Sequence, residues 1–385
     1  MNMLIEIHAL QNFAPSNLNR DDTGAPKDAL FGGTRRARIS SQCLKRAVRQ
    51  FLGSMIDRGL LIPEDVGTRT KRLCNEVVSC LVKGRPEEES KIKVQLALAA
   101  IGLPVKDDGK NEYLLFLGQR EIHEIARIID EKWASIQTPS VDGDKKKAGR
   151  AKKDAAKNAD PDLKKALEAV LNGGKAVDVA LFGRMLADMP ERNQDAACQV
   201  AHAISTHVVD REFDFYTAVD DLKPEDTAGA DMMGTVEFNS ACFYRYAVVD
   251  WNKLVGNLQA DKELALKGLR AFIEGFVVAE PTGKQNTFAA HNPPEFVAVS
   301  VRHEAAPRNF ANAFETAIRV RRDESLTGKS AESLVRKAAA LNAAFDGNCN
   351  KTVVLNLTGA DASEFGTSVK SLKELLDATI VAVKE

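Results

Sequence analysis

The sequence predicts an α+β protein in which one sheet domain carries large insertions. Three observations support this prediction. The residues at the N-terminus alternate with the period of a strand. Segments with strand and helix patterns follow one another along the whole chain. Two long strand-like segments flank a stretch that contains glycine and proline. The length of 385 residues and the hydrophobic content of 44% allow one large core or two moderate ones.

The first elements are a strand, an irregular stretch and a helix. Residues 3–10 alternate with a period of two, which is typical of a strand. Glycine and proline then predict irregular structure until Ser40 and Ser41, which can cap a helix. That helix is amphipathic. Its apolar side contains Leu44, Ala47, Val48 and Phe51, and its basic side contains Lys45, Arg46 and Arg49.

The middle of the chain predicts a helical insertion followed by a hairpin. Residues 67–129 have mainly helical spacing, and residues 142–165 are rich in Lys and Ala, which is typical of a solvated or disordered linker. The runs at 199–221 and 234–251 predict the two strands of an extended β-hairpin, with a flexible tip between them. The remaining expected elements are helices at 177–185, 264–278 and 309–320 and strands at 295–301 and 352–357.

Composition narrows the class of protein. A formal net charge of −1 excludes a uniformly basic coat but leaves room for one basic face. The six cysteines are scattered without a C-x-x-C pair, so we expect reduced, buried thiols. The N-terminus lacks a signal-peptide pattern and no apolar run has the length of a membrane span, so we expect a soluble, cytoplasmic protein.

One short stretch concentrates positive charge. No acid stands between Asp28 and Asp57, and a polyanion is the natural ligand of such an unneutralised patch. The Gly32-Gly33 pair would let backbone amides approach a phosphate, and the helix start would add its positive dipole end. A solvated helix face is the simpler alternative for the same residues. The six cations of the stretch are Arg35, Arg36, Arg38, Lys45, Arg46 and Arg49.

These residues also carry a resemblance to a known family. The stretch "SNLNRDDTGAPKDALFGGTRRARISSQCLKRAVR" resembles the N-terminal signature of the CasC-type (Cse4-type) backbone subunit of the type I-E CRISPR surveillance complex Cascade, a member of the RAMP superfamily. Residues 52–175 and the tail after residue 322 match poorly. Further segments match in the family's order: "VDVALFGRM", "AHAISTHVVD", "FYTAVDDL", "MGTVEFNSACFYRYA", "KQNTFAAHNPPEFV" and "NAFETAI".

The resemblance implies a hand-shaped fold and a structural role. An RRM-like (ferredoxin-like) palm would comprise residues 1–51 and 251–385, helical fingers residues 52–175, and a thumb hairpin with its base residues 176–250. Copies would stack head to tail along a CRISPR guide RNA in antiviral defence, with base pairing to target DNA supplying specificity. Implied further partners are the large and small Cascade subunits, a guide-end-capping RAMP subunit and the guide-processing endoribonuclease; no cofactor, metal or membrane is implied.

The resemblance also implies an RNA-contacting set. Lys45 and Arg49 stand four residues apart on one helical face, which suits phosphate contacts. Lys284 lies in "PTGKQNTF", which lacks the upstream glycine of a P-loop, so we expect contact with RNA or a neighbouring subunit there. The set carried over from the family is Arg20, Ser40, Gln42, Lys45, Arg49, Met185 and Thr206.

Two other functions stay open at this point. A RAMP-type ribonuclease would need a positioned acid or base, and the candidates are His8, Asp21, Asp22, His202 and His207. A metabolic enzyme with a basic substrate pocket is the second alternative. The overall match favours a non-catalytic subunit, so we expect no enzymatic activity.

Overall fold

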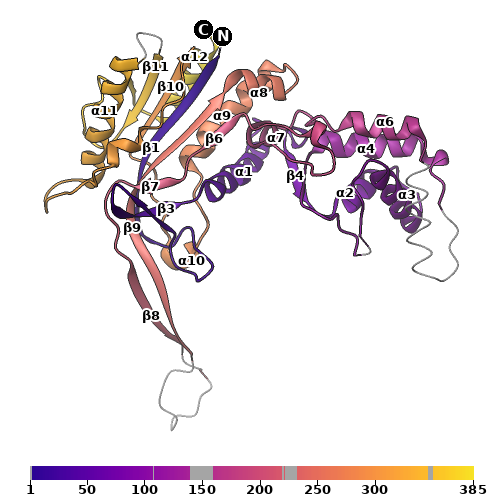
Figure 1. The fold of residues 1–385 in the computed structure, drawn as a ribbon, viewed down its shortest axis with the longest axis horizontal. Helices are drawn as coiled ribbons and strands as arrows, with labels where there is room; N and C mark the ends of the chain where they lie inside the picture. Colours follow the sequence, from indigo (N-terminus) through magenta and orange to yellow (C-terminus); the bar gives the residue numbers. More distant parts are fainter. Residues whose placement is uncertain (1, 107, 139–158, 219–220, 222–231, 346–349) are drawn as a thin grey trace. The chain divides into compact units, whose positions relative to one another are not determined.

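The computed structural model describes residues 2–106, 108–138, 159–218, 221, 232–345 and 350–385 (Figure 1). These residues form two compact units. The first unit comprises Met1–Leu52, Cys198–Asn252 and Leu269–Glu385, and the second comprises Gly53–Ala197 and Lys253–Gly268. Part of the basic segment 142–165, namely residues 142–158, lies outside the described residues.

The first unit is built on one large, mostly antiparallel sheet. Its strand order is β12-β11-β10-β1-β9-β7-β3-β2, and β6 and β8 pair with β9 beside this path. Only β11 and β12 run parallel among the paired strands of the described chain. The strands are β1 (Met3–Ser16), β2 (Asp28–Phe31), β3 (Thr34–Ile39), β6 (Cys198–Val200), β7 (Ala203–Ser205), β8 (Glu212–Ala218), β9 (Met232–Asp250), β10 (Phe296–His303), β11 (Asn350–Asn356) and β12 (Thr367–Val369).

The N-terminal strand lies at the centre of this sheet. β1 pairs with β9 and β10, so that Ile5 stands opposite both Val249 and Val301. β9 continues beyond the sheet, where it pairs with β8 as a two-stranded hairpin (Figure 1). The predicted hairpin is therefore confirmed, although the first of its two expected runs is divided into β6, β7 and β8.

Helices cover both faces of the sheet. α9 (Lys262–Val278) lies on the face of Arg245, whose guanidinium lies over the ring of Phe276. α1 (Ser41–Asp57) packs on α9, because a Cβ at Gly275 would meet the Phe51 side chain at 2.8 Å. On the opposite face, α11 (Leu326–Phe345) and η4 (Phe310–Phe314) share an apolar core with Leu4 and Leu10 of β1. α12 (Leu372–Lys384) packs on β10 and β11.

A buried polar cluster stands in the α11 side of the sheet. Glu6 of β1 forms an ion pair with Arg302 of β10, and both side chains are fully buried. The Tyr246 hydroxyl donates to Glu6 Oε1 at 2.5 Å. His8 Nδ1 lies 2.9 Å from the Tyr244 hydroxyl, and burial lowers the pKa of His8 to about 3.

The second unit contains the helical insertion. A two-stranded sheet of β4 (Gly67–Thr70) and β5 (Leu115–Gly118) accompanies its helices. Leu73, Ile125 and Leu167 belong to one shared core. The helices of this unit are α2 (Leu73–Cys80), α3 (Glu87–Ala100), α4 (Gln119–Glu131), α6 (Pro161–Val170), α7 (Val177–Phe182) and α8 (Trp251–Asn257), with 3-10 turns η1 (Pro63–Asp65), η2 (Trp133–Ser135) and η3 (Pro190–Arg192).

Several expectations from the sequence need correction. The helix expected at 309–320 is only the short 3-10 turn η4. The expected solvated linker ends earlier than residue 165, because α6 begins at Pro161, where Asp160 caps it and Leu163 and Leu167 are buried in the core. The tail contains two helices that no pattern predicted, α11 and α12.

Two further expectations from composition concern the cysteines and membrane-spanning helices within the described part of the chain. None of the five cysteines described there forms a disulfide, as predicted, although Cys43 and Cys80 are only half-buried. Among these residues no helix combines the length and the apolar content that a membrane crossing requires.

The buried His8 predicts acid sensitivity. Its pKa is lower in the folded chain than in the unfolded chain, so the unfolded state binds more protons below pH 6.5 and the folded state loses stability as the pH falls toward about 3. This group alone should change the free energy of unfolding by up to ~1.4 kcal/mol per pH unit. We expect His8→Phe to remove that slope, as measured by urea unfolding at a series of pH values.

The control replaces a histidine that is not fully buried. His303→Phe, at the half-buried end of β10, should leave the pH slope of wild type unchanged. Identical slopes for His8→Phe and wild type would contradict the prediction.

Candidate nucleic-acid interface

The Gly32-Gly33 pair closes a β-hairpin. β2 and β3 are antiparallel, with Phe31 opposite Thr34, so the two glycines form the entire turn. Their φ values of +56° and +73° suit the tight hairpin turns that match the twist of the strands. Residues 17–27 are irregular, as expected. Residues 28–39, where irregular structure and a phosphate-binding loop were expected, form a paired hairpin instead, and the glycines are explained by turn geometry.

The hairpin removes Arg36 from the predicted RNA-binding set. Its side chain is fully buried, and its guanidinium donates to the carbonyl oxygens of Ser205 at 3.1 Å and Phe314 at 2.9 Å. Burial also lowers the pKa of Arg36, although the carbonyl oxygens accept hydrogen bonds from it. No exposed surface of Arg36 is left for a ligand, since alternation along β3 turns it inward while Arg35 faces solvent.

The other two arginines of β3 are partly engaged. Arg35 is exposed and forms an ion pair with Asp28, which also pairs with Arg211 at 2.7 Å. Arg38 is half-buried, and its Nε donates to the Asp28 carbonyl oxygen at 3.0 Å. Arg38 Nη1 also lies 3.1 Å from His202 Nδ1. Asp28 therefore neutralises part of the charge that the sequence assigned to this stretch.

The helix α1 begins as predicted. The Ser40 hydroxyl accepts a hydrogen bond from the Cys43 amide at 3.3 Å, and the Ser40 amide donates to Asn19 Oδ1 at 2.8 Å. The buried Ser40 thus caps the helix. Leu44 and Val48 are buried as expected, while Gln42 and Arg46 are exposed and Lys45 and Arg49 are half-buried.

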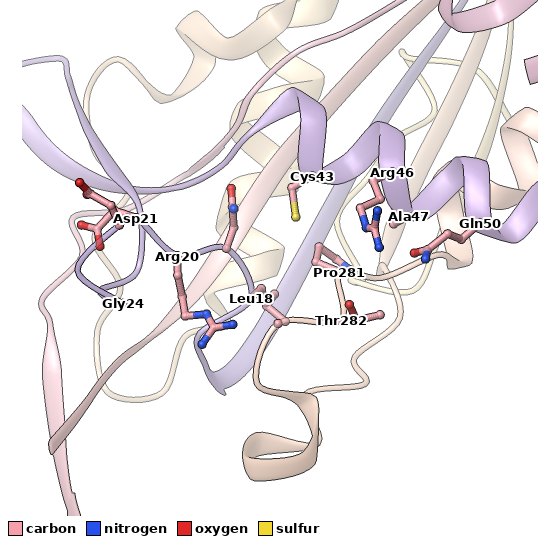
Figure 2. Close-up of a pocket in the computed structure, with 13 residues that line it drawn as sticks. Leu18, Arg20, Asp21, Gly24, Cys43, Arg46, Ala47, Gln50, Pro281 and Thr282 are labelled. Carbon is pink, nitrogen blue, oxygen red and sulfur yellow. The ribbon is translucent and has the colours of Figure 1, made fainter. Parts of the chain in front are cut away.

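A cavity of about 520 Å³ lies beside α1 in the first unit. Figure 2 shows Cys43 and Arg46 on the helix, facing the loop that bears Arg20 and the segment that bears Pro281. This segment lies against the chain at residues 17–18, because a Cβ at Gly283 would lie 2.3 Å from the Leu18 carbonyl oxygen. The lining residues are Leu18, Asn19, Arg20, Asp21, Asp22, Gly24, Cys43, Arg46, Ala47, Gln50, Pro281, Thr282 and Gly283.

Nearby cations act on two titratable groups, Cys43, which lines the cavity, and His202, which does not. Burial raises the pKa of the Cys43 thiol, while Lys27 and Arg46 act in the opposite direction. Burial, Arg38 and Lys27 all lower the pKa of His202. Within the described part of the chain, Lys45 and Arg46 have no carboxylate partner. We call Arg20, Lys27, Lys45 and Arg46 the α1 basic patch. Lys27 was not predicted, because it stands before the acid-free stretch.

The acids and histidines near the patch have structural roles. The Asp21 carboxylate accepts from the Thr23 amide, the Thr23 hydroxyl and the Ala25 amide, and these hydrogen bonds lower its pKa. His207 Nδ1 lies 2.7 Å from the Val208 carbonyl oxygen. Among the described residues no group of three or more His, Cys, Asp or Glu side chains is placed to hold a metal.

Three other predicted residues do not line this cavity. Thr206 is buried, and its Oγ1 accepts from Ser330 Oγ at 2.9 Å, so it has no exposed surface for a ligand. Met185 belongs to the second unit, where 76% of its surface is exposed. Lys284 is half-buried with a φ of +53°, a left-handed conformation that is strained for a lysine.

The chain folds into a mixed α and β protein, in which Arg20 and Arg46 line a cavity beside α1 together with Asp21 and Asp22. A model of the family described as CT1975-like protein matches residues 5–379, so the chain belongs to this family. No curated protein matches the chain.

Many solved structures are similar to this chain. One, described as "CRISPR RNA-guided surveillance complex, pre-nicking", is 30% identical with a TM-score of 0.82, and the match covers 98% of this chain and 99% of that one. Another, described as "CRISPR RNA-guided surveillance complex", is 25% identical with a TM-score of 0.63, and the match covers 99% of each chain.

The hairpin turn gives a matched pair of substitutions. A Cβ at Gly32 would lie 1.8 Å from the Glu315 carbonyl oxygen, whereas a Cβ at Gly33 would meet nothing within 4 Å. Both residues have positive φ, so each alanine should cost ~1 kcal/mol of backbone strain. We expect Gly32→Ala to destabilise the protein by at least ~2 kcal/mol more than Gly33→Ala, because its new Cβ would overlap the Glu315 carbonyl oxygen. Chemical denaturation measures both, and equal losses of stability would contradict this close approach.

Proposed function

We propose that this chain is a non-catalytic, guide-RNA-binding backbone subunit of a type I-E Cascade surveillance complex. The observation that carries the proposal is the α1 basic patch, whose cations Lys45 and Arg46 have no carboxylate partner among the described residues. Cations of this kind hold a sugar-phosphate backbone without reading its bases. Family membership and the similarity to CRISPR RNA-guided surveillance complex structures agree with this role.

The two units suit the parts of the proposed hand. The sheet unit corresponds to the palm, which in the family is RRM-like, and the second unit corresponds to the fingers. The hairpin of β8 and β9 corresponds to the thumb. Its Phe213 and Phe215 are 65% and 64% exposed, and register places Met233, 66% exposed, on the same face. Exposed apolar side chains of this kind suit burial when another copy and its RNA are present.

Head-to-tail stacking completes the proposed role. A heterologous contact between identical copies leaves an open helical assembly, whose length the guide would set. The remaining proposed partners are the large and small subunits, the guide-end-capping subunit, the guide-processing endoribonuclease and target DNA through the guide.

The roles of the acids and histidines support a non-catalytic subunit. Asp21 accepts hydrogen bonds within its own loop, and the fully buried His8 has a pKa of about 3, far from that of a useful general base near neutral pH. His207 is engaged with main-chain groups, because its Nε2 also lies 3.3 Å from the Cys242 amide. Asp22, which is exposed in the cavity wall, is the sharpest candidate for the ribonuclease alternative.

Salt dependence tests the RNA-binding proposal. The variant Lys45→Ala/Arg46→Ala should reduce the slope of log affinity against log salt for single-stranded RNA by ~1.4, or ~0.7 for each phosphate that is no longer neutralised. The matched control Lys91→Ala/Arg127→Ala removes the same charge from cations that already pair with Glu87 and with Glu124 and Glu131. It should leave the slope unchanged. Equal slopes for the α1 variant and wild type would defeat the proposal.

A cleavage assay tests the non-catalytic role. The assembled complex is incubated with divalent metal and RNA complementary to its guide, and the products are resolved by length. We expect intact target RNA for wild type and for Asp22→Ala alike. Cuts at regular intervals that disappear in Asp22→Ala would establish the ribonuclease alternative instead.

A further inference from the structure

A second cluster of arginines lies in the segment between η4 and α11. Residues 319–323 read Arg-Val-Arg-Arg-Asp, and all five are exposed. Within the described chain, Arg319, Arg321 and Arg322 have no carboxylate partner for their guanidinium groups. Figure 1 shows the segment that leads into α11 standing out from the sheet as a loop. We call residues 319–323 the arginine loop.

Both ends of the arginine loop are fixed. Before it, the Ile318 amide donates to the Thr206 carbonyl oxygen at 2.9 Å. After it, the Glu324 carboxylate accepts from the Arg321 amide at 3.0 Å and lies 3.8 Å from Lys329 Nζ. The nearest acid outside the loop is therefore engaged with the main chain and a lysine. Three arginines and Asp323 leave the loop itself with a net charge of +2.

The elements that flank the arginine loop and the helix of the α1 basic patch pack on opposite faces of the sheet. η4 and α11, which flank the loop, pack on the sheet face of Leu4 and Leu10. α1 packs on α9, and α9 covers the other face. One strand held along α1 therefore does not account for the cations of the loop.

We propose that the arginine loop is a second polyanion-binding surface, which holds the phosphates of a nucleic-acid strand other than the one at α1. Arg presents a planar fork of donors that matches two phosphate oxygens, and exposed Arg without an acidic partner is suited to this contact. The loop ends are anchored, so less chain entropy is lost when the phosphates bind. This inference goes beyond the proposed guide-RNA site and does not require it.

The composition of the loop favours nucleic acid over a protein partner. The core of a protein interface is depleted in charge and rich in aromatic and apolar residues. Here Val320, 41% exposed, is the one large apolar side chain among residues 319–323. The hairpin of β8 and β9 has the opposite character, with exposed Phe213 and Phe215. The two surfaces are therefore suited to different ligands.

The experiment uses the full chain purified after co-expression with a guide RNA, and the probe is a fluorescent oligothymidylate unrelated to the guide. Arg319→Ala/Arg321→Ala/Arg322→Ala should reduce the salt slope for the probe by ~2, which lowers affinity ~100-fold at 0.1 M salt. The RNA content of the particle should not change. The matched control is Lys91→Ala/Arg127→Ala/Lys267→Ala, in which each replaced cation already has an acidic partner, and it should retain the wild-type slope.

Three outcomes overturn the inference. An unchanged slope in the triple variant means that the arginine loop faces only water. Loss of guide RNA from the triple variant means that the loop belongs to the guide site. A smaller particle mass with an unchanged slope means that the loop contacts another copy of the chain.

Failure of the guide-RNA proposal gives a different result. If the purified chain holds no RNA, the same titration is run on the RNA-free chain. The triple variant and Lys45→Ala/Arg46→Ala should then lower the slope additively when combined, because the two surfaces are independent. A combined variant no weaker than either parent would show a single surface and overturn the inference.

Discussion

The pairing of β1 with β9 is the constraint on which the rest of the first unit depends. It joins Ile5 to Val249 across most of the chain and sets which side chains face α11 and which face α9. A shift of the β1 register by one residue would turn each of its side chains to the opposite face of the sheet. Glu6 and His8 would then face α9 instead of α11. The same strand β9 continues into the hairpin with β8, so the pairing also sets where the exposed aromatic residues begin.

The buried polar cluster makes this register specific. Glu6 meets Arg302 and Tyr246 only when β1, β9 and β10 are aligned as observed. A buried ion pair adds little stability relative to an apolar core of the same shape, but one partner left alone is strongly destabilising. The cluster therefore mainly destabilises other registers of the three strands. Their remaining residues are largely Val, Ile and Ala, which could pack in more than one register.

Patterns of local residues predicted much of this fold. The strand at residues 3–10, the capped amphipathic helix α1 and the hairpin of β8 and β9 follow from periodicity and capping, which are properties of short segments. The expected helix at 309–320 failed because contacts between parts far apart in the sequence hold this stretch: the Arg36 guanidinium donates to the Phe314 carbonyl oxygen, and the Ile318 amide donates to the Thr206 carbonyl oxygen. α11 and α12 were missed although Ser325 and Ser371 stand at their starts and accept hydrogen bonds from the Gly328 and Glu374 amides.

The sequence predicted where the candidate site lies but not which of its cations are exposed and without acidic partners. Charge clustering located α1, but counting cations could not show that Arg36 is buried or that Arg35 pairs with Asp28. Lys27 and the arginine loop were missed because acids stand beside them in the sequence, and only the structure shows which of those acids are already engaged.

The order of the strands has a consequence for biosynthesis. β1 is translated before its partners β9 and β10, which end at Asp250 and His303, so its two edges stay open until both of these strands have been translated. An apolar strand with open edges is a site for aggregation, and long-range pairing is slow. Nascent chains of this protein should therefore depend on a holding chaperone at the ribosome for longer than a protein whose sheet closes between neighbouring strands.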